Sequence, residues 1–320
     1  MEEKKAVLFD IGRYRNTDGP GIRTILFFKG CPLRCKWCSN PFGLSKKRQL
    51  VVNPSRCTGC GTCVEVCHHQ VNIVSTPGEP VQVEFQNCTL CGDCIDRCLN
   101  GARTISGKEY TPRELAREAG KDAAFYRRGG GGVTVSGGEV MLQWEAAAET
   151  LRLCRSQNLN TCMETSGFGP WEHLWAMAQY CHTVFMDLKH IDSARHRELT
   201  GVGNERILVN MERLCDELPK RGGRVIIRMP LVPGFNDDDE SVASAARFVA
   251  GLPNAPELNL LPYHDLGATK YEMIGEEYQM PDVESRKKKD PRIQAIFALC
   301  RACAPENRVS LGGEAIDLTR

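Results

Sequence analysis

Three cysteines in the segment GCPLRCKWCSN, residues 30–40, have a spacing that suits metal chemistry. Cys31, Cys35 and Cys38 fall within eight residues, and an aromatic residue, Trp37, directly precedes the last of them. Four closely held thiolates would saturate a tetrahedral zinc ion or complete the ligation of a cubic iron–sulfur cluster. Three thiolates leave one metal position open, so the segment predicts a site where a ligand that is not protein binds and reacts.

Eight further cysteines follow between residues 53 and 107, where the spacing CxxCxxCxxxC occurs twice. The two runs are Cys57, Cys60, Cys63, Cys67 and Cys88, Cys91, Cys94, Cys98. This doubled spacing is that of the two-cluster bacterial ferredoxins, in which the fourth cysteine of each run ligates the other cluster. It predicts one [4Fe-4S] cluster on Cys57, Cys60, Cys63 and Cys98, and another on Cys88, Cys91, Cys94 and Cys67. Zinc is the less favoured metal, because zinc ribbons use paired CxxC units.

Composition excludes several classes of partner. The 320-residue chain has 41 basic and 40 acidic residues and a net charge of +1, which favours neither nucleic acid nor an anionic membrane. No segment approaches the ~18 apolar residues of a membrane span, and the first apolar stretch is too short for a signal peptide. We therefore expect a cytoplasmic protein whose seventeen cysteines bind metals more than they form disulfides. Four in apolar contexts are expected to be small buried hydrophobes: Cys154, Cys162, Cys181 and Cys215. We predict no role for Cys300 and Cys303.

The elements that must position these cysteines alternate between short apolar strands and amphipathic helices. Candidate strands cover residues 24–28, 133–135, 161–164, 183–188, 224–229 and 257–263. Candidate helices cover residues 112 to about 128, 143–157, 171–180, 204–219 and 237–250. The first helix opens with a capping box at Thr111 and Glu114. The alternation predicts an α/β fold with a parallel sheet, curled or closed like a barrel.

Residues 53–107 do not fit this alternation, since they combine eight cysteines with Gly, Pro and Asn turns and little helical periodicity. Without them the chain has close to the ~250 residues typical of a (β/α) barrel. We expect residues 53–107 to form a small inserted domain, and residues 1–52 and 108–320 to form the barrel.

Polar residues stand at the ends of six successive candidate strands, and a barrel places its chemistry at that face. Cys31 follows the first strand. The groups at the next five strand ends are Glu139, Glu164, Asp187 with Lys189, Arg228 and His264. Singly, each has an ordinary structural explanation, but as a set they are expected to converge on one site.

The CxxxCxxC loop directly after the first strand resembles the cluster loop of the radical S-adenosylmethionine (SAM) enzymes. The resemblance implies a partial (β/α)6 barrel in which Cys31, Cys35 and Cys38 hold three irons of a [4Fe-4S] cluster. The amino and carboxylate groups of SAM would chelate the fourth iron, which accounts for the open metal position. A zinc knuckle with a distant fourth ligand and buried free cysteines are the alternatives.

Upstream, TDGPGIRT at residues 17–24 resembles the signature of the glycyl-radical-enzyme activating enzymes. The resemblance continues through SGGE (136–139), ETSGF (164–168), DLKH (187–190), IRMPLVPGFND (227–237) and LPYHDLG (261–267). In that family the signature lies where the glycine loop of the partner enters. The resemblance assigns this role to Asp18, Gly19, Pro20, Gly21 and Arg23. The segment alone would be interpreted as a tight turn.

The resemblance also implies contacts to SAM. Gly137, Gly138 and Glu139 would meet its amino end, while Lys189 would pair with its carboxylate. Trp37 and its neighbours would contact the adenine, His264 the nucleoside, and Arg228 either SAM or the incoming peptide. The full set implied for SAM is Trp37, Cys38, Ser39, Gly137, Gly138, Glu139, Glu164, Thr165, Asp187, Leu188, Lys189 and His264. The set implied for catalysis is Cys31, Cys35, Cys38, Lys189, Arg228 and His264.

Glu164 departs from the aspartate common in the best-known formate-lyase activators. There this carboxylate, the threonine after it and the equivalent of Asp187 form a site for a small monovalent cation. A monovalent cation is therefore a further cofactor that the resemblance implies, at a position where this chain has one more methylene.

The function implied is that of an activating enzyme. An electron enters the SAM-bound cluster, SAM splits into methionine and a 5′-deoxyadenosyl radical, and the radical takes hydrogen from a backbone glycine of a partner enzyme. Activators with such an insert serve eliminating or decarboxylating glycyl radical enzymes, such as choline trimethylamine-lyase, isethionate sulfite-lyase, a diol dehydratase or an arylacetate decarboxylase. The insert would relay electrons from a flavodoxin or ferredoxin-type donor. The alternatives are a radical SAM enzyme acting on a small molecule and an iron–sulfur electron carrier.

Overall fold

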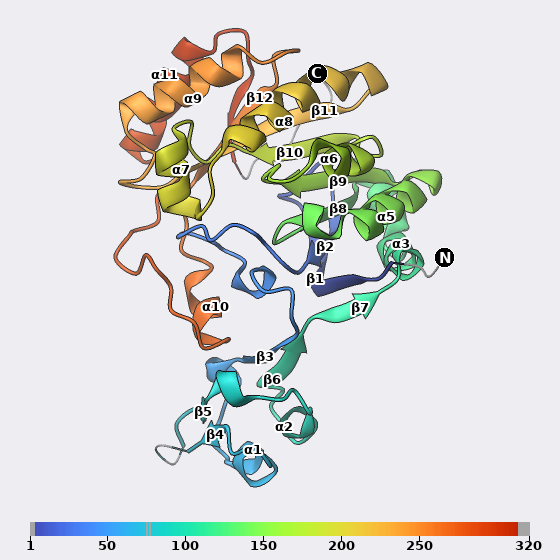
Figure 1. Cartoon of the computed structure of the whole chain (residues 1–320), viewed down its shortest axis with the longest axis vertical. Coiled ribbons are helices and arrows are strands. Elements are labelled where there is room, and N and C mark those ends of the chain that lie inside the picture. The colour runs from blue at the N-terminus through green and yellow to red at the C-terminus, as the bar shows by residue number, and fades with distance from the viewer. Residues whose placement is uncertain (1–3, 75, 77, 313–320) are drawn as a thin grey trace.

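A nine-stranded sheet forms the centre of the computed structural model, which describes residues 4–74, 76 and 78–312 (Figure 1). The strand order is β13-β12-β11-β10-β9-β8-β2-β1-β7. Its parallel core consists of β2 (Arg23–Phe28), β8 (Gly132–Gly137), β9 (Asn160–Thr165), β10 (Thr183–Asp187), β11 (Arg224–Leu231) and β12 (Glu257–Pro262). These confirm the six predicted strands. In the described chain β13 (Val309–Leu311) and β7 (Lys108–Tyr110) are the two edges of the sheet and do not pair with each other, so the barrel is partial.

The parallel strands separate two environments because successive side chains point to opposite faces. In β8, Val133 and Val135 are fully buried in the main hydrophobic core. The residues between and after them, Thr134 and Ser136, instead make polar contacts inside the barrel. The same alternation in the neighbouring strands keeps one face apolar for the helices and gives the other face to the site.

Helices cover the outer face of the sheet (Figure 1). They are α3 (Pro112–Gly120), α4 (Ala123–Gly129), α5 (Trp144–Ser156), α6 (Trp171–Ala178), α7 (Ser193–Thr200), α8 (Glu205–Glu217), α9 (Asp239–Ala250) and α11 (Pro291–Cys303). The capping box of Thr111 and Glu114 is confirmed. The single helix predicted from residue 112 to about 128 is wrong, since α3 and α4 are separate. Between them the Asp122 carboxylate is buried and accepts a hydrogen bond from Thr24 (2.8 Å) instead of capping α4.

The sequence prediction omits β1 (Ala6–Arg15), β7, β13, α7 and α10 (Ala268–Glu272). β1 pairs antiparallel with β2, and irregularities between Leu8 and Asp10 and between Gly12 and Arg15 break its alternation. The cysteines predicted to be small buried hydrophobes are all buried: Cys154, Cys162, Cys181 and Cys215. None of the described helices is both long and apolar enough to traverse a bilayer. A cytoplasmic location stays a prediction.

Residues 53–107, here called the cysteine-rich segment, project from one end of the barrel (Figure 1). At the base of the segment, its own strand β6 (Arg103–Ser106) pairs antiparallel with β3 (Gln49–Val52) of the preceding chain. Beyond the base lie α1 (Thr62–Glu65), β4 (Asn72–Ile73), β5 (Gln82–Val83) and α2 (Asp93–Asp96). Each short helix begins after a glycine in the left-handed region, Gly61 at φ 77° and Gly92 at φ 100°. The two halves of the segment therefore repeat one local conformation as well as one cysteine spacing.

Two contacts tie this segment and its base to the barrel. The fully buried Lys29 at the end of β2 donates a 2.9 Å hydrogen bond to Gln49 at the start of β3. Burial lowers the pKa of Lys29 to about 8. After α10, Gly275 packs so closely on Phe85 that a Cβ there would lie 2.3 Å from the ring. The strand at the base is thus held by the chain after β2, and the cysteine-rich segment itself by the chain after α10.

Candidate functional site

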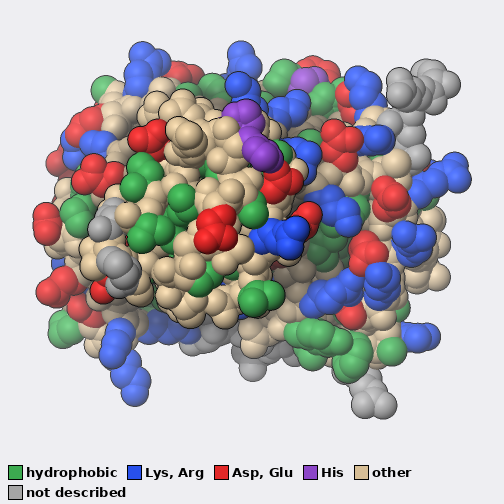
Figure 2. Space-filling view, turned by 90° about the horizontal axis from the view of Figure 1, so that it is seen from below, with side chains coloured by type: hydrophobic (Ala, Val, Ile, Leu, Met, Phe, Trp, Pro, Cys, Tyr) green, Lys and Arg blue, Asp and Glu red, His purple; other side chains and the backbone are tan. Residues whose placement is uncertain are grey.

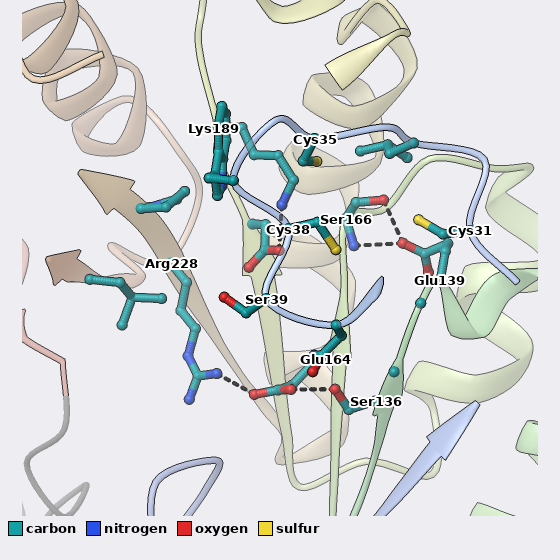
Figure 3. Close-up of a pocket in the computed structure, with 18 of the residues that line it drawn as sticks. Cys31, Cys35, Cys38, Ser39, Ser136, Glu139, Glu164, Ser166, Lys189 and Arg228 are labelled. Carbon is teal, nitrogen blue, oxygen red and sulfur yellow. Dashed lines mark hydrogen bonds and ion pairs between the residues drawn. The ribbon is translucent and has the colours of Figure 1, made fainter. Parts of the chain in front are cut away.

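The carboxyl ends of the parallel strands enclose a pocket of about 280 Å³ (Figure 3). The residues of the predicted site that line it are Cys31, Cys35, Trp37, Cys38, Ser39, Gly137, Gly138, Glu139, Glu164, Thr165, Asp187, Lys189, Arg228 and His264. Leu188 does not line it, because its side chain is buried in the hydrophobic core. The structure thus brings the three-cysteine loop and the polar strand ends together, while their roles toward SAM remain predictions.

The three-cysteine loop is braced by segments far away in the sequence. The backbone N–H of Arg34 donates to the carbonyl of Thr200 at the end of α7 (2.7 Å). From α10, the Tyr271 hydroxyl donates to the carbonyl of Cys38 (3.1 Å). Trp37 is almost completely buried in a small cluster with Tyr263 and others. The loop is therefore shaped by the protein itself on both sides of the cysteines.

The donor set of the loop fits a cluster with one ligand per iron. Among the residues that the structure describes, no three His, Cys, Asp or Glu side chains are placed to share a single metal ion. In a [4Fe-4S] cluster each cysteine bonds a different iron. Cys31, Cys35 and Cys38 all line one pocket that has room for a further ligand.

Glu139 is a buried carboxylate that no cation neutralises among the described residues. It accepts hydrogen bonds from the Thr165 hydroxyl (2.6 Å), the Ser166 backbone N–H (2.7 Å) and the Met141 N–H (3.2 Å), and also from the Ser166 hydroxyl. All these donors are neutral, and burial raises the pKa of Glu139. A ligand ammonium would remove the cost of keeping this carboxylate charged. The sequence prediction did not include Ser166, although the residue lies in the ETSGF stretch, directly after a strand-end Glu-Thr pair.

Lys189 and Asp187 form an ion pair on the pocket wall. The Lys189 ammonium donates to the Asp187 carboxylate over 2.6 Å, and the lysine side chain is 10% exposed. Burial alone would lower the pKa of Lys189, but the Asp187 carboxylate and the nearby Cys35 raise it above its usual value. Lys189 thus keeps its charge and suits a ligand carboxylate.

Glu164 and Arg228 form a second ion pair deeper in the pocket (Figure 3). Ser136 donates to the other carboxylate oxygen of Glu164, and Arg228 also lies 3.5 Å from Asp18. Burial and the Asp18 carboxylate raise the pKa of Glu164 to about 8, while the Arg228 charge opposes this rise. Arg228 Nε is buried and has no hydrogen-bond partner among the residues that the structure describes. Both Glu164 oxygens are thus engaged by protein donors, so a monovalent cation would have to compete with the guanidinium.

The segment predicted to meet a partner, residues 18–23, does not line the pocket wall but reaches it through Asp18. Its Arg23 has no exposed surface. The guanidinium donates to the Thr134 hydroxyl (2.8 Å) and to the carbonyls of Pro20 (2.9 Å) and Val133 (2.7 Å). Arg23 therefore holds the turn from inside. A role in partner contact remains a prediction for Asp18, Gly19, Pro20 and Gly21.

Four of the eight cysteines in the cysteine-rich segment share one cavity. Quartet B, comprising Cys67, Cys88, Cys91 and Cys94, lines one small cavity of about 20 Å³. One cysteine of the first run thus joins three of the second. Quartet A is the complementary set, Cys57, Cys60, Cys63 and Cys98. The Asn100 side chain donates to Thr58 (2.9 Å), which brings the chain after Cys98 against the first run.

Backbone N–H groups point at two of these sulfur atoms. Ala102 N–H donates to Cys98 Sγ (3.3 Å) and Val81 N–H to Cys57 Sγ (3.5 Å), both in quartet A. Such donors favour thiolates, and hydrogen bonds to sulfur are among the factors that set cluster potentials.

Comparison with known proteins gives a consistent family. The model of the radical SAM superfamily matches residues 25–246. The chain is 43% identical over 282 residues to the choline trimethylamine-lyase activating enzyme of Oleidesulfovibrio alaskensis, covering 87% of this chain and 90% of that one. It is 37% identical over 289 residues to the isethionate sulfite-lyase activating enzyme of Desulfovibrio desulfuricans, covering 89% and 92%. Among solved structures, peptide-bound SuiB of Streptococcus suis matches 88% of this chain and 46% of its own, with a TM-score of 0.50 and 13% identity, a likeness of fold alone.

Proposed function

Since the chain belongs to the radical SAM superfamily, and within it to the family of the activating enzymes just named, we propose that it activates a glycyl radical enzyme. In this reaction SAM is cleaved reductively, and the resulting 5′-deoxyadenosyl radical takes hydrogen from a backbone glycine of the partner protein. The observation that carries the proposal is the pocket itself. It combines three thiols, a buried carboxylate that no described cationic side chain neutralises, and a buried lysine, and its two charged groups complement those at the methionine end of SAM.

Cys31, Cys35 and Cys38 would hold a [4Fe-4S] cluster, which when bound supplies the electron that splits SAM. The other residues orient the substrate. Glu139 receives the ammonium and Lys189 the carboxylate, so the methionine end is fixed by two opposite charges that follow β8 and β10, with β9 between these strands. The burial of both side chains strengthens these interactions, because little water competes for them.

Two rivals are less well supported. An electron carrier has no use for a strand-end pocket with charges of both signs. A radical SAM enzyme for a small molecule would use the pocket, but it gives no reason for the segment around Asp18, which Arg23 holds against the deep end of the site. A protein substrate accounts for both the strand-end pocket and the segment around Asp18. Partners of the kinds served by the relatives, such as choline trimethylamine-lyase, isethionate sulfite-lyase, a diol dehydratase or an arylacetate decarboxylase, are the candidates.

The cysteine-rich segment is proposed to be a ferredoxin-like domain, in which quartets A and B each hold a [4Fe-4S] cluster. With four cysteines for each cluster, no position is open for SAM, so the segment serves to conduct electrons from a flavodoxin or ferredoxin-type donor to the three-cysteine loop. The crossed composition of quartet B supports this assignment. Seen from the end that carries the segment, acidic, basic and hydrophobic side chains are intermingled (Figure 2). Leu99, next to Cys98, is fully exposed and is available to a donor protein.

Replacing Lys189 with methionine should weaken SAM binding by about ten- to a hundredfold, because a hydrogen bond to a charged group is worth ~1.5–3 kcal/mol. The measurement is the SAM dependence of 5′-deoxyadenosine formation by anaerobically reconstituted protein with a chemical reductant. Lys47→Met, which alters an exposed lysine outside the pocket, is the matched control and should keep the wild-type dependence. An unchanged half-saturating SAM concentration in Lys189→Met would refute the assigned role, and a wild-type protein unable to form 5′-deoxyadenosine would refute the proposed function.

A further inference from the structure

Arg103, at the start of β6, lies between the two cysteine quartets. Its side chain is 2% exposed. The Nη1 atom is 3.9 Å from the Cys94 sulfur of quartet B and donates to the Asn72 side chain over 2.7 Å. Asn72 in turn donates to the backbone carbonyl of Cys63, a member of quartet A, over 2.8 Å. One buried guanidinium therefore lies near a sulfur of quartet B and is linked through Asn72 to the backbone of quartet A.

No carboxylate compensates this charge in the described part of the chain. Arg103 forms no ion pair with any described residue. The Nη2 atom of Arg103 is buried and has no hydrogen-bond partner there. Arg13, on β1, shows the usual arrangement, with Glu118 and Asp122 both at hydrogen-bond distance. A buried cation with an unused donor is expensive. An anion at the quartets would remove this cost, and a [4Fe-4S] cluster with four thiolates carries net negative charge.

We propose that Arg103 is the shared counter-charge of quartets A and B and raises the reduction potential of the clusters bound there. This rests on the proposed function, in which both quartets hold [4Fe-4S] clusters. Adding an electron makes a cluster more negative, so a positive charge fixed nearby favours the reduced form. The effect is larger at quartet B, which Arg103 contacts directly, than at quartet A, which it reaches through Asn72. A higher potential lets the segment accept electrons from a carrier protein.

The test is a potentiometric titration of the full-length protein, followed by electron paramagnetic resonance. Cys31, Cys35 and Cys38 are first replaced with alanine, so that only clusters of the cysteine-rich segment contribute to the spectrum. In this background Arg103→Met should shift both midpoint potentials to lower values, with the larger shift at quartet B. Arg103→Lys keeps the charge and should titrate close to the parent. Arg97→Met removes an exposed arginine from the same segment and should cause no resolved shift, because water and salt screen it.

Each outcome is decisive. An Arg103→Met protein with full iron content and parental potentials would overturn the proposal. If that variant fails to bind iron at the quartets while Arg103→Lys binds it and titrates normally, the charge itself is required and the proposal stands. If neither variant binds iron, the guanidinium is needed for the fold and not as a charge, and the proposal falls. A parent protein without iron at the quartets would refute the cluster assignment first, before any Arg103 variant is compared.

Discussion

Replacing Cys35 with alanine should reduce 5′-deoxyadenosine formation to the background level, whether electrons come from a chemical reductant or from a protein donor. Cys35 lies in the strand-end pocket with Cys31, Cys38, Glu139 and Lys189. The chemistry needs three protein ligands and one open metal position, and with two ligands the cluster loses its anchorage. The loss should therefore not depend on how electrons are supplied.

The matched control for this change is Cys215→Ala. Cys215 is 1% exposed in α8, belongs to the main hydrophobic core and does not line the pocket. Its replacement should lower stability slightly and leave SAM cleavage near the wild-type rate. Circular dichroism must show that both variants fold. A folded Cys35→Ala protein that still forms 5′-deoxyadenosine at an appreciable rate would exclude this loop as the site of SAM cleavage.

Replacing Cys60 and Cys91 together should have a different signature. Both side chains are exposed, one in each quartet, so their truncation creates no cavity. Activity driven by a flavodoxin or ferredoxin-type donor should fall by at least about tenfold. Replacing even a residue that only hydrogen-bonds to a metal ligand typically lowers activity or metal affinity by that factor. SAM cleavage with a small chemical reductant should largely survive, because the three-cysteine loop is intact.

Iron analysis supports the interpretation of this double variant. Three [4Fe-4S] clusters correspond to about twelve irons per chain. The wild type should contain about twelve irons, and the double variant about four. A metal-dependent domain can unfold when its clusters are lost, so folding must again be checked. If the variant folds but loses activity equally with both kinds of donor, the segment does not act as a relay. It would then shape the barrel or bind the partner.

Most of the fold was predictable from patterns within short stretches of the sequence. The six parallel strands were predictable because each is a short apolar run between helical patterns, and the start of α3 because a capping box is a sequence signal. The prediction failed where distant contacts decide. Between α3 and α4, the Asp122 carboxylate is bound by Thr24 and Arg13, both far away in the sequence, and no pattern in the sequence indicated this break. β1 was missed because its bulges break the alternation that marks a strand.

The candidate site shows the same division. Cysteine spacing and strand-end positions brought Cys31, Glu139 and Lys189 into one predicted site, and the structure places all three in the same pocket. The partners that tune these groups were not predictable. Ser166 binds Glu139 from 27 positions away, and Arg103 reaches Asn72 across 31. Such pairs have no fixed spacing in the sequence, and only the folded chain reveals them.

The activity proposed for this chain is the generation of a radical on a glycine of a partner protein. The most direct measurement is electron paramagnetic resonance of the anaerobically reconstituted protein mixed with SAM, a reductant and purified candidate partners from the four classes named above. We predict that at least one partner acquires a glycyl radical signal, which requires SAM and is absent with the Cys35→Ala variant. Continued formation of 5′-deoxyadenosine without a glycyl radical in any of these partners would contradict the claim and favour a small-molecule substrate.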